Sequence, residues 1–131
     1  MIKNNSFILI IDDDLELCEE IQEILTDTGY QVDFANGGLE GLKKYNEKTY
    51  QLIILDLKMP DINGLEVLKQ IKKNNKSVKV IIITARTKLN IEVTEISKNK
   101  KEDNILKLAD RILQKPFKIR NLLSIIDNFL R

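Results

Sequence analysis

Three acidic side chains follow two apolar runs of the sequence, at the point where each run ends. Asp12 and Asp13 come directly after FILII, and Asp56 closes the run YQLIILD. Two carboxylates about 4 Å apart, in a medium with an effective dielectric near 20, repel each other by about 4 kcal/mol. A cluster of such groups therefore favours a bound cation, and ligands that offer only oxygen atoms favour Mg²⁺.

Two further residues at the ends of apolar runs carry complementary chemistry. Thr84 closes VKVIIIT with a hydroxyl group, and Lys115 follows DRILQ with a positive charge. Together with a divalent cation, Lys115 would neutralise the three carboxylates. One carboxylate could then attack phosphorus while Thr84 donates a hydrogen bond to the transferred phosphoryl group. A threonine or a lysine alone is usually structural or solvated, but all five residues at four strand ends favour a site.

The elements that must bring these residues together alternate between strands and helices along the whole chain. Continuous apolar runs and one alternating run predict five strands, at 7–11, 30–34, 50–56, 78–84 and 110–114. Helical periodicity predicts helices within 15–28, 37–48, 65–71, 87–109 and 119–130. This order predicts an α/β fold with a parallel sheet covered on both faces. In such a sheet, functional groups gather at the carboxyl ends of the strands.

Local signals refine three of these helices. Asp14 is a predicted N-cap of the first helix, and Gly29 a predicted stop after it. Leu39, Leu42 and Tyr45 predict a second helix, weakened by its glycines. Leu65, Leu68 and Ile71 predict the third helix, which begins after the turn PDING.

Composition limits the class of protein. The chain has 131 residues, the size of one domain spanning 1–131, and Lys+Arg (21) nearly balance Asp+Glu (20). This balance gives no indication of direct nucleic-acid binding, and the apolar runs are too short for a membrane span. The single cysteine, Cys18, is expected in the core and favours a cytoplasmic location. The chain contains no histidine, so a phosphohistidine donor would have to lie on another protein.

Four stretches of the sequence resemble the receiver domain of two-component response regulators. They are LIIDDD, LIILDLKMPDINGLEVL, IIITA and QKPF, in this order and on the predicted elements. The resemblance covers essentially the whole chain, and D-x-K-M-P-x-x-x-G is its most specific part. It implies a flavodoxin-like fold, with a five-stranded parallel sheet of order 2-1-3-4-5.

The resemblance also implies roles for individual residues around a metal ion. Asp56 matches the residue that accepts the phosphoryl group. Asp13 matches a direct Mg²⁺ ligand, and Asp12 a residue that assists largely through water. The backbone carbonyl of Lys58 matches a further ligand.

Other matched residues would act on the phosphoryl group and its donor. Thr84 matches the hydroxyl that moves onto the group, and Lys115 the lysine that pairs with it. Pro116 matches a proline whose preceding peptide bond is usually cis. The donor implied is a sensor histidine kinase or a histidine phosphotransfer domain, and the downstream effector is unknown.

Three features depart from the family pattern. Ile112 stands where the family has the aromatic residue of its switch. The interval from Thr84 to Lys115 is long, which predicts an inserted loop or an extended fourth helix around 97–107. Leu108 and Ala109 replace a Gly-Ala turn. All three fall on the face formed by the fourth helix, the fifth strand and the fifth helix, through which receivers commonly bind partners or form homodimers.

Two positions border the predicted pocket, and two other functions compete with a phosphorylated receiver. Lys58 and Arg86 are expected to modulate the loss of the phosphoryl group. IIDDDL also resembles the motif of haloacid-dehalogenase-like phosphatases, which would make Asp12 the nucleophile. Alternatively, the chain is a receiver-like binding module that signals without phosphorylation, which Ile112 and the insertion favour.

Overall fold

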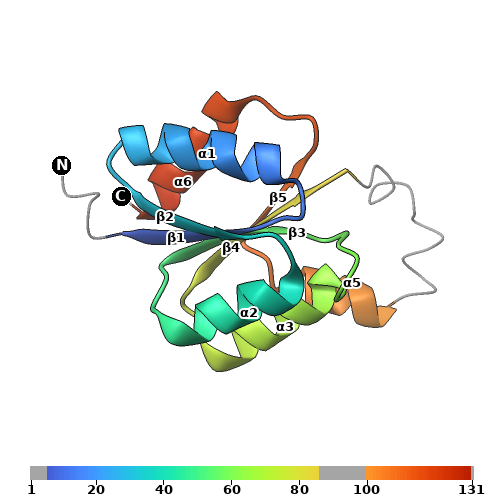
Figure 1. Ribbon diagram of the computed structural model, residues 1–131. Coiled ribbons are helices and arrows are strands. Elements are labelled where there is room, and N and C mark those ends of the chain that lie inside the picture. The colour runs from blue at the N-terminus through green and yellow to red at the C-terminus, as the bar shows by residue number, and fades with distance from the viewer. Residues whose placement is uncertain (1–5, 86–99, 131) are drawn as a thin grey trace.

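A computed structural model describes residues 6–85 and 100–130 of the chain. The described residues form three layers, with a parallel sheet between two layers of helices (Figure 1). The strand order is β2-β1-β3-β4-β5, which confirms the predicted 2-1-3-4-5 sheet. The strands are β1 (Phe7–Ile11), β2 (Gln31–Ala35), β3 (Leu52–Asp56), β4 (Lys79–Thr84) and β5 (Arg111–Gln114).

Helices lie on both faces of this sheet, as the alternating pattern predicts. Figure 1 shows α1 and α6 on one face, and α2, α3 and α5 on the other. Their bounds are α1 (Leu15–Asp27), α2 (Gly38–Glu47), α3 (Gly64–Asn74), α5 (Lys100–Leu106) and α6 (Ile119–Leu130). Two predicted ends of α1 are confirmed, since the Asp14 side chain accepts a hydrogen bond from Leu17 N and Gly29 has a φ of 102°.

The core consists of two apolar clusters, one on each face of the sheet. Alternate residues of β1 divide between them, since Ile8 and Ile10 face α1 and α6 while Leu9 and Ile11 face α2 and α3. All five residues of β3 are buried. A strand buried on both faces can place polar side chains only at its ends, which is where the predicted site residues lie.

The predicted second helix is confirmed as α2, and its Leu42 and Tyr45 pack against the core, whereas the Leu39 side chain is 59% exposed. Helix α2 also approaches the sheet through the bare backbone of Gly41. A Cβ atom at Gly41 would lie 2.6 Å from the Ile11 side chain, so only glycine fits at this contact. Periodicity of large apolar residues misses a packing face that glycine forms.

The predicted insertion is described only in part. Helix α5 at Lys100–Leu106 falls inside the 97–107 segment and inside the helical region predicted over 87–109. Residues 86–99 lie outside the described residues; they include Arg86 and the first part of the 97–107 segment. The choice between an inserted loop and an extended fourth helix therefore remains a prediction.

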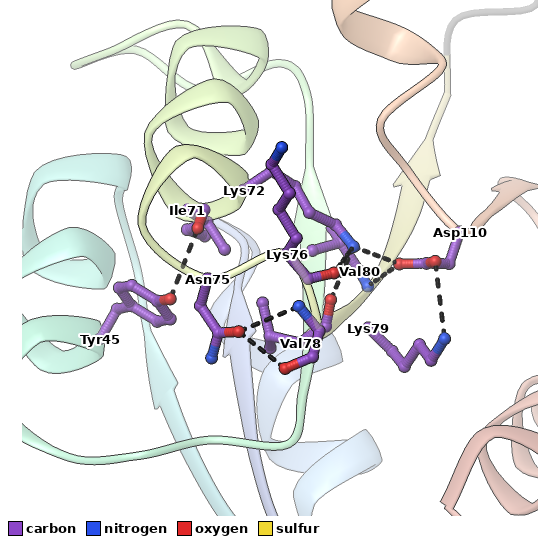
Figure 2. Close-up of polar contacts among 10 residues, drawn as sticks. Tyr45, Ile71, Lys72, Asn75, Lys76, Val78, Lys79, Val80 and Asp110 are labelled. Atoms are coloured by element: carbon purple, nitrogen blue, oxygen red, sulfur yellow. Dashed lines mark hydrogen bonds and ion pairs between the residues drawn. The ribbon is translucent and has the colours of Figure 1, made fainter.

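A buried lysine ties α3 to the start of β4 and β5 (Figure 2). Lys72 is 7% exposed, and its Nζ donates to Val78 O at 2.7 Å and to Asp110 Oδ2 at 2.8 Å. The same Asp110 oxygen accepts a hydrogen bond from Val80 N at 2.8 Å. Because β5 is an edge strand, this network fixes the end of the sheet opposite the predicted site.

The substitution Asp110→Ala is expected to destabilise the protein by about 3 kcal/mol, because it leaves the Lys72 charge buried without its partner. Urea denaturation measures the loss. Asp110→Asn, which keeps an acceptor for Val80 N, should lose less. The double variant Lys72→Met/Asp110→Ala should recover much of the stability. A loss for Asp110→Ala below about 1 kcal/mol, the range of exposed ion pairs, would contradict this account.

Candidate functional site

The predicted site residues meet at the carboxyl edge of the sheet. Asp12 follows β1, Asp56 and Thr84 end β3 and β4, and Lys115 follows β5. Asp12 and Thr84 are fully buried and Asp56 is 5% exposed, whereas Asp13 lies at the surface. The site therefore has a buried floor and one exposed acidic side chain at its mouth.

Lys115 supplies the positive charge of this cluster. Its Nζ lies 3.0 Å from Asp12 Oδ2 and 3.7 Å from Asp56 Oδ2. The Lys115 backbone N–H donates to Thr84 O at 2.8 Å, and the peptide bond between Lys115 and Pro116 is cis, as predicted. The turn after β5 thus directs the lysine back across the ends of β4, β3 and β1.

Asp12 is held by several groups besides Lys115. Its Oδ1 accepts a hydrogen bond from Asp14 N at 3.0 Å. Its backbone carbonyl accepts from Asn36 Nδ2 at 3.1 Å and from the Cys18 thiol at 3.3 Å. Asn36 was not among the predicted residues. Its only signal in the sequence is an amide side chain after the second strand, in a position equivalent to Asp12.

Asp12, Asp13 and Asp56 form a cluster suited to a divalent metal ion. One carboxylate oxygen from each lies within 4.8 Å of the others. An all-oxygen donor set suits a hard cation such as Mg²⁺ or Ca²⁺. Both Asp12 oxygens already have partners in the protein, whereas Asp13 is exposed and faces solvent. This difference favours Asp13 as a direct ligand.

Opposing effects act on the pKa of the Asp56 carboxylate. Burial raises the pKa of Asp56 above its usual value, and the negative charge of Asp12 raises it further. Lys115 and the Lys58 backbone N–H, which donates to Asp56 Oδ1 at 3.3 Å, act in the opposite direction. A bound cation would also favour the ionised form, which is the nucleophilic one.

The charge of Lys115 is stabilised by its surroundings. Burial alone would lower the pKa of Lys115, but the hydrogen bond and ion pair with Asp12, together with the charge of Asp56, outweigh it. The pKa of Lys115 is therefore raised, and its side chain is charged across the physiological range. A permanent cation at this point can stabilise negative charge that develops beside Asp56.

Cys18 lies next to the site and takes no part in its chemistry. Its side chain is fully buried, as predicted, and burial with the nearby Asp12 charge raises the pKa of Cys18 to about 12. A thiol with such a pKa is neither a good nucleophile nor a good metal ligand at neutral pH.

Comparison with known families decides what this arrangement is. The family model of the response regulator receiver domain matches residues 8–127. The chain is a member of the receiver domain family. It is a signalling module rather than a classical enzyme, and this overturns the alternative of a haloacid-dehalogenase-like phosphatase.

Relatives and solved structures agree with this assignment. The receiver is 40% identical over 129 residues to the transcriptional regulatory protein CpxR homolog of Haemophilus influenzae, covering 96% of this chain and 51% of that protein. It is 39% identical to the response regulator ArlR of Staphylococcus epidermidis, covering 95% of this chain and 52% of that protein. The chain thus spans about half the length of these relatives.

Solved receivers have the same architecture. A CheY-like receiver domain protein from Methanospirillum hungatei superposes with a TM-score of 0.80 at 30% identity, covering 95% of this chain and 93% of that one. The response regulator TrrA from Thermotoga maritima, solved in complex with Mg²⁺-BeF, gives a TM-score of 0.80 at 33% identity, covering 95% of this chain and 99% of that one.

None of the helices among the described residues of this receiver has the length and apolar character of a membrane span.

Asp13→Asn is expected to weaken divalent metal binding by about tenfold or more, because it removes a charge from the acidic cluster while leaving the buried Asp12 and Asp56 in place. Isothermal titration with Mg²⁺ measures the change. Asp14→Asn is the matched control, since it removes a neighbouring exposed charge but keeps a side chain that can cap α1. Equal affinities for Asp13→Asn and the parent protein would remove Asp13 from the metal site.

Proposed function

We propose that Asp56 accepts a phosphoryl group from a phosphohistidine of a sensor histidine kinase or a histidine phosphotransfer domain. The observation that carries this proposal is the environment of Asp56. It is a nearly buried carboxylate, 3.7 Å from the Lys115 ammonium, and it forms a cluster with two further acids. Such a group is accessible to a small reacting centre and is surrounded by the charges that phosphoryl transfer requires.

In the proposed reaction, an Asp56 oxygen attacks phosphorus and forms an acyl phosphate. The bond between phosphorus and the donor histidine nitrogen breaks, and the imidazole leaves. Lys115 stabilises the negative charge on the phosphoryl oxygens, and Thr84 donates a hydrogen bond to one of them. The Lys58 N–H orients Asp56 through its bond to Oδ1.

Asp12, Asp13, Asp56 and the Lys58 carbonyl would hold Mg²⁺ during this transfer. A cation held there would supply positive charge to offset the negative charge of the carboxylates and of the phosphoryl group. The TrrA structure, with its Mg²⁺-BeF complex, and a structure described as the BeF3-activated DrrB receiver domain support this assignment by analogy.

Phosphorylation should be tested with acetyl phosphate as a small donor, in the presence and absence of Mg²⁺. The expected result is a Mg²⁺-dependent mass gain of one phosphoryl group, located on Asp56 by peptide mapping. Asp56→Asn should remove it, because an amide is not a nucleophile here.

The outcomes separate the proposed function from its alternatives. No Mg²⁺-dependent adduct on Asp56 would refute the proposal and favour a receiver-like module that signals without phosphorylation. In that case, a partner protein would bind Asp56→Asn and the parent protein with equal affinity, both with and without a phosphodonor. Lys115→Ala gives a second check, since it should slow phosphorylation while leaving the nucleophile in place.

We also propose a signalling output through the face formed by α5, β5 and α6. Ile112 and Leu108 on this face are each 41% exposed, although both are large apolar residues. Ile112 lies on the edge strand β5, and its exposure makes its side chain a surface group. The exposed apolar side chains favour contact with an effector or with a second receiver.

Ile112→Asp is expected to abolish self-association that depends on phosphorylation, because it places a charge in the centre of the proposed contact. Light scattering after size-exclusion chromatography, with and without acetyl phosphate and Mg²⁺, measures the oligomeric state. Leu39→Asp changes an exposed leucine on α2 and is the matched control. A phosphorylated dimer that persists in Ile112→Asp would exclude this face as the dimer contact.

A further inference from the structure

Asp61 caps a helix that is distant from it in the sequence. Its Oδ1 accepts a hydrogen bond from Gly38 N and its Oδ2 one from Leu39 N, both at 3.0 Å. These are the first two residues of α2, whose N-cap residue, Gly37, has no side chain to supply such bonds. The negative charge of Asp61 also lies at the favourable end of the α2 dipole.

The charge of Asp61 is stabilised although the side chain is exposed. The backbone N–H groups of Leu39 and Gly38 hold the pKa of Asp61 below its usual value, with a smaller contribution from Ile62 N, which donates at 2.9 Å. Asp61 lies in the loop between β3 and α3, and it therefore connects this loop to α2.

The contact requires bare backbone on the side of α2. A Cβ atom at Gly37 would lie 2.8 Å from Asp61 Oδ2, and one at Gly38 would lie 2.0 Å from Ile62 Cγ2. The loop thus packs directly against the start of the helix. Glycines at 37 and 38 leave room for this close approach, and this explains the GG pair that opens α2.

The same loop carries the groups that orient Asp56. Lys58 N donates to Asp56 Oδ1 at 3.3 Å, and Gly64 N closes the loop by donating to Leu57 O at 3.0 Å. A Cβ atom at Gly64 would lie 2.5 Å from Leu57 Cα, so the two ends of the loop are pressed together. Between these ends, the Asp61 side chain attaches the loop to α2 through its two hydrogen bonds.

We propose that Asp61 is a positioning residue for phosphorylation, which holds the Lys58 peptide against Asp56 by fixing the β3–α3 loop to the N-terminus of α2. This inference rests on the proposed function. It assigns Asp61, Gly37 and Gly38 a role that is separate from the acids and the lysine of the pocket. Because the Lys58 N–H bond to Asp56 is already long, a small displacement of the loop would weaken it.

The test compares Asp61→Ala, Asp61→Asn and Gly37→Ala by two measurements. Asp61→Ala should slow phosphorylation of Asp56 by acetyl phosphate and Mg²⁺ by about tenfold, the range typical of residues that orient a site from outside it. Amide hydrogen exchange at Gly38, Leu39 and Lys58 should speed up in the same variant. Asp61→Asn keeps one oxygen acceptor and should give intermediate values in both measurements.

Gly37→Ala provides an independent disruption of the same contact. Its backbone is extended, with φ −171° and ψ 163°, so alanine fits the chain but pushes the Asp61 carboxylate away. In the Asp61→Ala background, Gly37→Ala should have almost no further effect on the phosphorylation rate, since the atom that it displaces is gone. This non-additivity identifies the contact rather than either residue alone.

Asn75→Ala is the control for a simple loss of stability. Its Oδ1 accepts from Ser77 N at 2.9 Å in an exposed loop at the other end of the sheet, so it should lower the urea midpoint without changing phosphorylation. Unchanged Lys58 exchange and an unchanged phosphorylation rate in Asp61→Ala would overturn the inference, as would additive effects of Gly37→Ala and Asp61→Ala. If the parent protein gains no phosphoryl group, the proposed function fails, and Lys58 exchange alone then decides whether Asp61 positions the loop.

Discussion

The arrangement of this receiver depends on the compensation of buried negative charge at one edge of the sheet. Asp12 is fully buried and Asp56 nearly so, and two carboxylates in that position repel each other strongly. Lys115 lies 3.0 Å from one and 3.7 Å from the other, but a single lysine leaves the three-acid cluster with excess negative charge. The excess charge makes the cluster suited to a divalent cation, and each surrounding contact keeps these groups in place.

The two-sided core explains why the charges gather there. Because β1, β3 and β4 are covered by helices on both faces, their interior positions are apolar, and the first polar side chains come at the strand ends. Parallel strands direct all these ends toward one edge, so residues far apart in the sequence become neighbours. The fold thus gathers a concentrated set of charged side chains from the ends of separate strands.

Apolar strand interiors with polar ends make the fold and the central site predictable from the sequence. Apolar runs that end in Asp12, Asp56 and Thr84 indicate both the strand and its polar terminus. Asn36 and Asp61 were missed because their partners are backbone groups, which leave no pattern in the sequence. The contact of Gly41 with Ile11 has the same character, since a pattern of large side chains cannot reveal a packing surface formed by glycine backbone.

Strand β5 connects the site to the surface proposed for output. Asp110, before this strand, is fixed to Lys72 and to β4, and Lys115, after it, pairs with Asp12. Between them, Ile112 is exposed on an edge strand. Backbone pairing holds β5 to β4 from Arg111 to Gln114, and the Lys115 N–H continues this pairing to Thr84 O. The lysine of the site and the exposed Ile112 therefore lie on one short strand, so a change in the partners of Lys115 acts on the same element that carries the proposed output surface.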